Sequence, residues 1–347
     1  MTTTPTAAPL QDVIAALAHD RPLTQDGITA AFDVVMRGDA SPVQISALLT
    51  GLRVRGETPE VVAGAASALR RAMVRFEIPD SNQVVDTCGT GGGSVATFNI
   101  STAAALVAAG AGVKVAKHGN RSFTSKSGSA DVLEALGVDI DVDAAAMYRA
   151  YESAGIVFMY APRMHPAMRH VGPVRRELGV PTVMNIIGPL ANPASVGRQV
   201  IGVADAGRAA VIAAALSALG TIHSLVVHGE PGMDEISPLG TTRVLEVRGA
   251  VVREWSTDPE SLGTGVARAS ELMGGTPAKN AEIVRACLDG TAAPGAIAAV
   301  VANAGAAIYV AGKARTLAEG VRIAKAAIAD GSATATLEKL RAALPRS

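Results

Sequence analysis

A glycine-rich stretch between a short apolar strand and a helix is the strongest local sign of chemistry in this sequence. The segment DTCGTGGGSVATFNIST, residues 86–102, places its glycines ahead of Asn99, Ser101 and Thr102, which are expected at the start of the helix. Glycine lets main-chain N–H groups approach an anion closely, and the first N–H groups of a helix lack partners within it. These features predict a phosphate site that suits a diphosphate.

A simpler interpretation of the same stretch is that the glycines form a tight turn and Asn99 caps the helix. Two familiar nucleotide motifs are excluded. The stretch lacks the GK[ST] ending of a P-loop, and Ser94 stands where a dinucleotide fingerprint requires glycine or alanine. Any phosphate site here is therefore of another kind.

A second segment, KHGNRSFTSKSGSADVLEALG, combines basic side chains with glycines and hydroxyl groups. Its cationic candidates are Lys117, His118, Arg121 and Lys126. This composition suits the binding of phosphate oxygens, although a solvated basic loop is the alternative. Ser129 is predicted to cap the helix that follows.

An adjacent carboxylate pair, Asp234 and Glu235, follows the apolar strand predicted at residues 223–229. Carboxylate oxygens beside phosphates are common ligands of Mg²⁺. An isolated pair in a sequence such as PGMDE is otherwise typical of a solvated turn. The sequence contains no HExxH motif and no Ser-His-Asp or Cys-His nucleophile signature.

Composition narrows the class of protein. The 347 residues carry 31 basic and 31 acidic side chains, so a nucleic acid is not the expected partner. Cys88 and Cys287 are far apart and indicate neither a zinc cluster nor a disulfide framework, which favours a cytoplasmic setting. The uncharged run at 291–312 is rich in alanine and glycine and contains Pro294 and Asn303, which favours a buried helix over a membrane span.

The elements that must position these residues follow from hydrophobic spacing and end signals. Residues 10–73 read as helices throughout, and Thr24, Ser41 and Thr58 are each expected just before the start of a helix. Strands are expected near 84–87, 113–116, 198–204, 223–229, 242–247 and 250–255. The expected fold class is α/β, with a mainly parallel sheet flanked by helices and a small all-helical domain. We expect that helical domain at 1–75, with a returning segment at about 166–194, and a larger α/β domain at 76–347.

Several motifs in order make the chain resemble the anthranilate phosphoribosyltransferase family. These are GTGG at 89–92, NIST at 99–102, KHGNR at 117–121, VRRELG at 174–179, GPLANPA at 188–194 and MDEIS at 233–237. The resemblance extends from the helical N-terminus to about residue 310. It implies transfer of the phosphoribosyl group of 5-phosphoribosyl 1-diphosphate (PRPP) to the amine of anthranilate, with Mg²⁺ as cofactor and diphosphate as leaving group. This reaction is the second step of tryptophan biosynthesis from chorismate.

The resemblance also implies roles for individual residues. PRPP would be bound by Gly89, Gly92, Gly93, Thr97, Asn99, Ile100, Ser101, Thr102, Lys117, His118, Gly119, Asn120, Arg121, Ser122, Phe123, Thr124, Ser125 and Ser129. Anthranilate would be bound by Gly89, His118, Asn120, His165 and Arg175, and the metal by Ser101, Asp234 and Glu235. No residue is implied as a covalent nucleophile. Arg176 is the nearest rival of Arg175, because adjacent helical positions point about 100° apart.

The sequence departs from the family pattern at one position, and two alternative functions and a dimer are also considered. Gly93 stands where the family commonly has an aspartate, which leaves open how the ribose or a second metal ion is held. A pyrimidine nucleoside phosphorylase of the same fold and a non-catalytic nucleic-acid-binding relative are the alternative functions. The family resemblance and the apolar N-terminal helices favour a homodimer through the helical domain.

Overall fold

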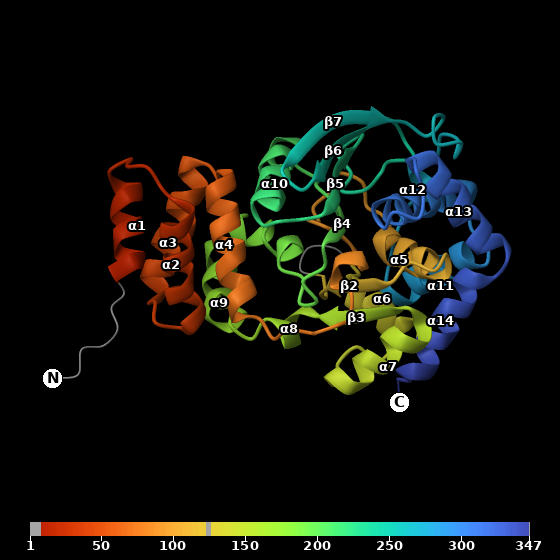
Figure 1. The fold of residues 1–347 in the computed structure, drawn as a ribbon, viewed down its shortest axis with the longest axis horizontal. Helices are drawn as coiled ribbons and strands as arrows, with labels where there is room; N and C mark the ends of the chain where they lie inside the picture. The colour runs from red at the N-terminus through yellow and green to blue at the C-terminus, as the bar shows by residue number, and fades with distance from the viewer. Residues whose placement is uncertain (1–7, 123–125, 347) are drawn as a thin grey trace.

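The computed structural model describes residues 8–122 and 126–346, and its centre is a sheet in the order β3-β2-β1-β4-β5-β6-β7 (Figure 1). The strands are β1 (Val85–Gly89), β2 (Val115–Gly119), β3 (Ile156–Tyr160), β4 (Arg198–Gly202), β5 (His223–Gly229), β6 (Thr242–Arg248) and β7 (Val251–Thr257). The first five strands run parallel, whereas β6 and β7 are antiparallel. The expected α/β class with a mainly parallel sheet is confirmed.

Four N-terminal helices form a bundle beside the sheet (Figure 1). They are α1 (Ala8–Ala18), α2 (Gln25–Arg37), α3 (Pro42–Arg55) and α4 (Pro59–Ala72). Thr24, Ser41 and Thr58 cap three of them, each accepting a hydrogen bond from an N–H of the first turn. Each cap satisfies an N–H that the helix cannot, which is why these helices begin where the sequence predicts.

The returning segment packs against this bundle. It contains α8 (Ala161–Met164), α9 (Met168–Leu178) and the short 3₁₀ helices η2 (Val183–Asn185) and η3 (Gly188–Leu190). Helix α9 contacts α2 and α3, and α10 (Ala206–Ala218) contacts α4. The buried residues of the bundle therefore form one cluster with α9, α10 and one face of the sheet.

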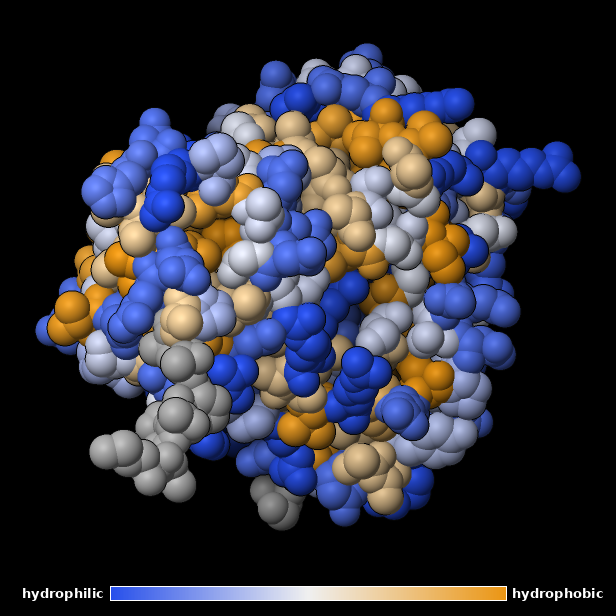
Figure 2. Space-filling view, turned by 60° about the vertical axis from the view of Figure 1, so that its left-hand side comes forward, coloured by the Kyte–Doolittle hydropathy of each residue, from blue (hydrophilic) through white to orange (hydrophobic). Residues whose placement is uncertain are grey.

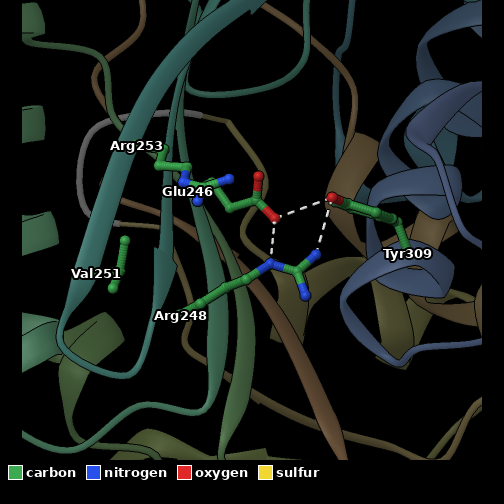
Figure 3. A pocket seen from close by; sticks show the side chains of 5 residues that line it. All are labelled: Glu246, Arg248, Val251, Arg253 and Tyr309. Atoms are coloured by element: carbon green, nitrogen blue, oxygen red, sulfur yellow. Dashed lines mark hydrogen bonds and ion pairs between the residues drawn. The ribbon is translucent and has the colours of Figure 1, made fainter.

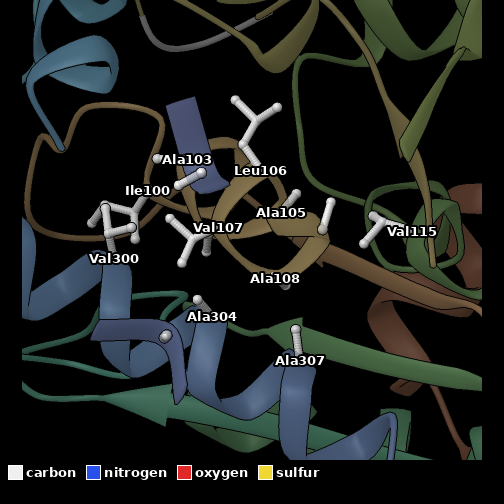
Figure 4. Packing of buried hydrophobic residues seen from close by; sticks show 14 of the residues in the cluster. Ile100, Ala103, Ala105, Leu106, Val107, Ala108, Val115, Val300, Ala304 and Ala307 are labelled. Carbon is white, nitrogen blue, oxygen red and sulfur yellow. The ribbon is translucent and has the colours of Figure 1, made fainter. Parts of the chain in front are cut away.

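The remaining helices cover the other face of the sheet (Figure 1). They are α5 (Ile100–Gly110), α6 (Ser129–Ala135), α7 (Ala144–Ala154), α11 (Pro277–Leu288), α12 (Pro294–Val310), α13 (Leu317–Ala329) and α14 (Ser332–Ala343), with η1 (Ser81–Gln83) and η4 (Ala269–Glu271) in loops. Alanine and valine dominate the contact of α5 with α12, so the two helices pack closely (Figure 4). Helix α12 is the predicted buried helix. Within residues 8–122 and 126–346, no helix has the length and apolar character needed to cross a membrane.

One strand was missed by the sequence analysis. β3 is a continuous apolar run, IVFMY, between Gly155 and Pro162, and its first four residues are buried. It lies beside β2 at the edge of the parallel region and is covered by α7. The signal was present, since a short apolar run bounded by glycine and proline is typical of a buried parallel strand.

The carboxyl ends of the parallel strands meet along one edge of the sheet. Gly89 at the end of β1 is in register with Gly202 at the end of β4, and Gly119 ends β2. The chain passes from β1 to β2 on one side and returns to β4 on the other, so the strand order reverses at β1. A crevice outside such a reversal is the usual ligand site of an open α/β sheet.

Candidate active site

The glycine loop leaves β1 at this edge of the sheet. Gly91 and Gly92 adopt left-handed backbone conformations, with φ of 71° and 80°, which other residues rarely tolerate. The N–H of Gly91 donates to Asp234 at 2.8 Å, whereas the N–H groups of Gly92 and Gly93 have no hydrogen-bond partner within the described chain. The loop therefore presents two free main-chain donors, as the phosphate prediction requires.

The start of α5 differs from the expectation. The N–H of Ile100 donates to Phe98 and that of Thr102 to Asn99, so these two groups are already used. Asn99 precedes the helix without a side-chain capping bond, which removes the simple capping role. The Thr102 hydroxyl is buried without a hydrogen-bond partner in the described residues. It is the polar group of this turn that the protein itself leaves unsatisfied.

The carboxylates of Asp234 and Glu235 lie against the glycine loop rather than in a solvated turn. A Cβ on Gly89 would lie 2.4 Å from Asp234 Oδ2, so any larger residue there would displace the carboxylate. Burial raises the pKa of Asp234, and burial together with the neighbouring charge of Asp234 raises the pKa of Glu235 to about 8. Two crowded, desolvated carboxylates are unfavourable unless a cation compensates them.

This donor set fits Mg²⁺ held jointly with a substrate. Within the described residues, no three His, Cys, Asp or Glu side chains gather closely enough to hold a metal by themselves. Mg²⁺ is commonly bound by one or two carboxylates, with water and substrate phosphates completing its shell. Asp234, Glu235 and the Ser101 hydroxyl would hold the ion, which would neutralise charge developing on a leaving diphosphate.

Lys117 is buried below the loop and is not a free cation. Its ammonium donates to the carbonyl of Thr87 and to Ser101 Oγ at 3.3 Å. Burial lowers its pKa, and the charge of Asp86 opposes that change. Asp86 is itself fully buried and accepts from the N–H of His118 at 3.2 Å and from Asn192 at 2.8 Å. In this structure Lys117 therefore orients Ser101, a task the sequence analysis did not foresee.

His118 and His165 face each other, with their Nε2 atoms 3.1 Å apart. Burial lowers the pKa of His165 to about 4, and burial followed by the nearby His165 and Lys117 holds the pKa of His118 well below its usual value. Both rings are consequently neutral near pH 7, and one donates to the other. The expectation that His118 is a cation is wrong, because a charged ring would lack solvent here.

The neutral His165 predicts a stability loss in acid. Its unfolded pKa is near 6.5 and its folded pKa about 4, so its contribution is complete above pH 6.5 and declines as the pH falls toward 4. We expect this residue alone to cost roughly 2 kcal/mol of unfolding free energy between pH 7.5 and 5. Urea unfolding at both pH values checks this, and His165→Gln should remove that part of the pH dependence. The same pH dependence in the variant and the natural protein would contradict it.

Arg121 and Ser129 have partners other than those predicted. The Arg121 guanidinium pairs with Asp131 and Glu134 and donates to Tyr160, so phosphate would have to compete for it. Ser129 is not the cap of α6; the helix begins at Ser129, and the Asp131 carboxylate accepts from the preceding N–H of Gly128 at 2.8 Å. The sequence analysis placed the cap one residue too late. Gly128 precedes the helix but has no side chain, and the capping carboxylate comes from Asp131 inside the helix.

Other predicted residues in this loop are placed only partly. Ser129 Oγ donates to the carbonyl of Asn120 at 3.3 Å, which ties the loop to α6. The N–H of Ser122 donates to Asp131 at 3.2 Å, and Lys126 is exposed. Three predicted PRPP contacts lie outside the described residues: Phe123, Thr124 and Ser125.

Helix α9 distinguishes the two adjacent arginines. Arg175 is half-buried, and among described residues its guanidinium has no ion pair or hydrogen bond, while Arg176 is exposed. Burial lowers the pKa of Arg175. A partly desolvated, unpaired guanidinium is suited to an anionic ligand. The structure therefore favours Arg175 over Arg176 as a carboxylate-binding residue.

Several buried or half-buried polar groups around the site were missed. Asn280 of α11 is buried and donates to Asn99 Oδ1 at 2.8 Å. Asn192 was noted only as part of the GPLANPA motif, although it donates to the Asp86 carboxylate. Polar residues in otherwise apolar segments were the available signal, since buried amides must have partners.

Gly93, the departure from the family pattern, lies close to the carboxylates. A Cβ at this position would be 3.2 Å from Asp234 Oδ1 and 3.2 Å from the carbonyl of Gly232. A side chain here would therefore press on the oxygen of Asp234 that the loop leaves free. Glycine keeps that oxygen accessible to a ligand. It does not replace the negative charge that the family's aspartate would supply.

A cavity of about 400 Å³ lies at the ends of β6 and β7 that point away from the glycine loop (Figure 3). Its wall includes Glu246, Arg248 and Tyr309, joined by hydrogen bonds. Although burial opposes it, donation by Arg248, Tyr309, His223 and Trp255 lowers the pKa of Glu246. This is a satisfied structural network far from the glycine loop, and we do not assign the chemistry to it.

A sheet with a glycine loop and a carboxylate pair at its strand reversal, joined to a helical bundle, defines a class of glycosyl transferase. The family model for the glycosyl transferase family a/b domain matches residues 81–334, and the model for its helical bundle domain matches residues 11–73. The chain is 49% identical to anthranilate phosphoribosyltransferase of Rubrobacter xylanophilus over 95% of this chain and 96% of that protein. The chain therefore belongs to the anthranilate phosphoribosyltransferase family.

Solved structures agree with this assignment. The enzyme of Thermus thermophilus matches with a TM-score of 0.90 and 42% identity, covering 96% of this chain and 99% of that one. The Saccharomyces cerevisiae enzyme in complex with PRPP and Mg matches with a TM-score of 0.87 and 28% identity, covering 97% and 98%. The similarity thus includes both the helical bundle and the α/β part.

Proposed function

We propose that this chain transfers the phosphoribosyl group of PRPP to the amine of anthranilate, giving N-(5-phosphoribosyl)anthranilate and diphosphate. The observation that carries the proposal is the contact of Asp234 with the glycine loop, which brings carboxylates and free main-chain donors together at one edge of the sheet. As diphosphate leaves, positive charge develops on the ribose and negative charge on the leaving group. The protein has only to stabilise that charge and exclude water, and needs no covalent nucleophile.

The residues divide into three groups under this proposal. The N–H groups of Gly92 and Gly93 and the Thr102 hydroxyl bind the diphosphate. Asp234 and Glu235, with Ser101, hold Mg²⁺. The guanidinium of Arg175 binds the anthranilate carboxylate, and the neutral His118 and His165 provide hydrogen-bonding groups without adding charge. These residue roles are part of the proposal, and so is a domain boundary near residue 75.

The test is a direct assay. Purified protein is mixed with anthranilate, PRPP and Mg²⁺, and the loss of anthranilate fluorescence is followed together with the release of diphosphate. We expect stoichiometric loss and release that stop when Mg²⁺ is chelated. No Mg²⁺-dependent loss, or faster phosphorolysis of thymidine or uridine, would reject the proposal.

We further propose that the active form is a homodimer through α1 and α3. Helix α3 is apolar on two faces. One packs in the bundle core, and the other exposes Val43 and Val54, whose relative exposures are 78% and 83%. A groove of about 430 Å³ between α1 and α3 is lined by Ile14, Leu17 and Val54, and Figure 2 shows hydrophobic surface on this side of the molecule. An apolar groove beside protruding valines is suited to an identical copy related by a twofold axis.

Substitution at α3 tests the dimer. Val54→Lys should convert the proposed dimer largely to monomer in light scattering, because association would bury a charge in the apolar groove that Val54 lines. Lysine near the end of a helix is compatible with its dipole, so folding should survive. Val266→Lys, at a valine that is 63% exposed in the α/β part, is the control and should stay dimeric. A monomeric natural protein would end the proposal.

We also infer a cytoplasmic location. Both cysteines, Cys88 and Cys287, are unpaired thiols. Burial raises the pKa of each thiol, so neither is readily ionised. Unreactive, unpaired thiols fit a reducing compartment.

A further inference from the structure

Asn303 is a buried amide in the middle of the apolar helix α12, with 3% of its surface exposed. Its Oδ1 accepts from the main-chain N–H of Ile236 at 2.9 Å, and its Nδ2 donates to the carbonyl of Ile236 at 3.1 Å and to Ala299 at 2.9 Å. The side chain thus binds both main-chain groups of one residue, as a neighbouring strand would. Every hydrogen-bonding group of the amide except one lone pair is used.

Ile236 directly follows the carboxylate pair Asp234 and Glu235. It lies between β5 and β6, outside any helix or strand, and is fully buried. Without Asn303, the buried N–H and carbonyl of Ile236 would lose these partners. An unpaired buried polar group destabilises the fold by more than its hydrogen bond stabilises it. The segment would then shift to find new partners, and its carboxylates would move with it.

Helix α12 also supports the other side of the metal-binding set. Val300 and Ala304, on either side of Asn303, belong to the cluster that packs against Ile100 and Ala103 in the first turn of α5 (Figure 4). Ser101 lies in the same turn, and its main-chain N–H faces the Glu235 carboxylate. One rigid helix therefore braces both the carboxylates and the turn that carries Ser101.

We propose that Asn303 is a positioning residue that holds Asp234 and Glu235 at the correct separation from Ser101 for joint binding of a divalent cation and a diphosphate. The inference rests on the proposed function, because it concerns the same site. It adds a role for a residue that touches neither substrate nor metal. Loss of groups that orient metal ligands typically lowers metal affinity by about 10- to 100-fold.

The test measures cation binding directly. Free Mn²⁺ is titrated by electron paramagnetic resonance in the presence of PRPP, for the natural protein and for Asn303→Leu, which keeps the branched shape of the side chain and removes its hydrogen bonds. We expect the dissociation constant of Mn²⁺ to rise about tenfold or more, while the KM for anthranilate changes less than twofold. Asn303→Ser, which leaves room for a water molecule to bridge to Ile236, should lie between the two and serves if the leucine variant does not fold.

A matched control separates positioning from general destabilisation. Ile308→Ala removes buried volume from the same helix, five positions further on, and removes no hydrogen bond to residues 233–237, because an isoleucine side chain has no hydrogen-bonding group. It should lower thermal stability and leave Mn²⁺ binding unchanged. Equal weakening in Ile308→Ala and the Asn303 variants, or unchanged Mn²⁺ binding in the Asn303 variants, would overturn the inference. If the natural protein itself binds no Mn²⁺ with PRPP, the proposed function fails instead.

Discussion

Asp234→Asn should lower kcat by about 100-fold or more and raise the Mg²⁺ concentration needed for half-maximal activity. The amide oxygen of asparagine can still accept from the N–H of Gly91, which Asp234 now binds at 2.8 Å, so the turn should keep its shape. What is lost is one negative charge beside the leaving group. Steady-state rates across a range of Mg²⁺ concentrations, with thermal unfolding to confirm folding, measure the effect.

The matched control for this change is Asp258→Asn. The carboxylate of Asp258 also accepts a main-chain N–H at 2.8 Å, from Ser261, but it lies in an exposed turn after β7. The same chemical change there should leave kcat and the Mg²⁺ requirement within about twofold of the natural enzyme. If Asp234→Asn behaves like Asp258→Asn, the carboxylate pair is not the metal site.

Arg175→Ala should raise the KM for anthranilate by about 10- to 100-fold, with a smaller effect on kcat. A hydrogen-bonded pair between a guanidinium and a carboxylate contributes mainly to binding the aromatic acid, whose carboxylate does not react. The half-buried Arg175 has no protein partner among the described residues, so its removal breaks no internal ion pair. Initial rates with varied anthranilate at saturating PRPP measure the change.

Arg176 provides the comparison on the same helix. Arg176→Ala removes an equal charge from an exposed position and should alter neither KM by more than about twofold. Arg175→Lys should lie between the natural enzyme and Arg175→Ala, because lysine keeps the charge and loses the planar fork. A larger anthranilate effect in Arg176→Ala would exchange the roles of the two arginines.

Local features of the fold could be read from the sequence because their causes are local. Thr24, Ser41 and Thr58 precede their helices in the structure as predicted, since each cap satisfies a donor only three residues away. The glycine loop was recognised for the same reason. Gly91 and Gly92 can adopt a left-handed backbone without steric cost whatever surrounds them.

The charge states of the site could not be read in this way. Lys117 and His118 were expected to be cations beside a phosphate, but Lys117 is buried against Ser101 and Thr87, and His118 is neutral against His165. Burial and distant neighbours set a pKa, and neither is visible in a motif. Ser129 was also predicted to cap its helix, whereas the Asp131 carboxylate accepts from the N–H that precedes the helix.

The sequence by itself determined which elements form and which motifs carry the chemistry, because hydrophobic period, capping residues and glycine conformations act over a few residues. Only the tertiary structure decided which polar groups meet. Gly91 and Asp234 are 143 positions apart, and Ile236 and Asn303 are 67 apart, yet each pair shares a hydrogen bond. Such contacts depend on strand order and helix packing, since the carboxyl edge of a parallel sheet gathers loops that are distant along the chain.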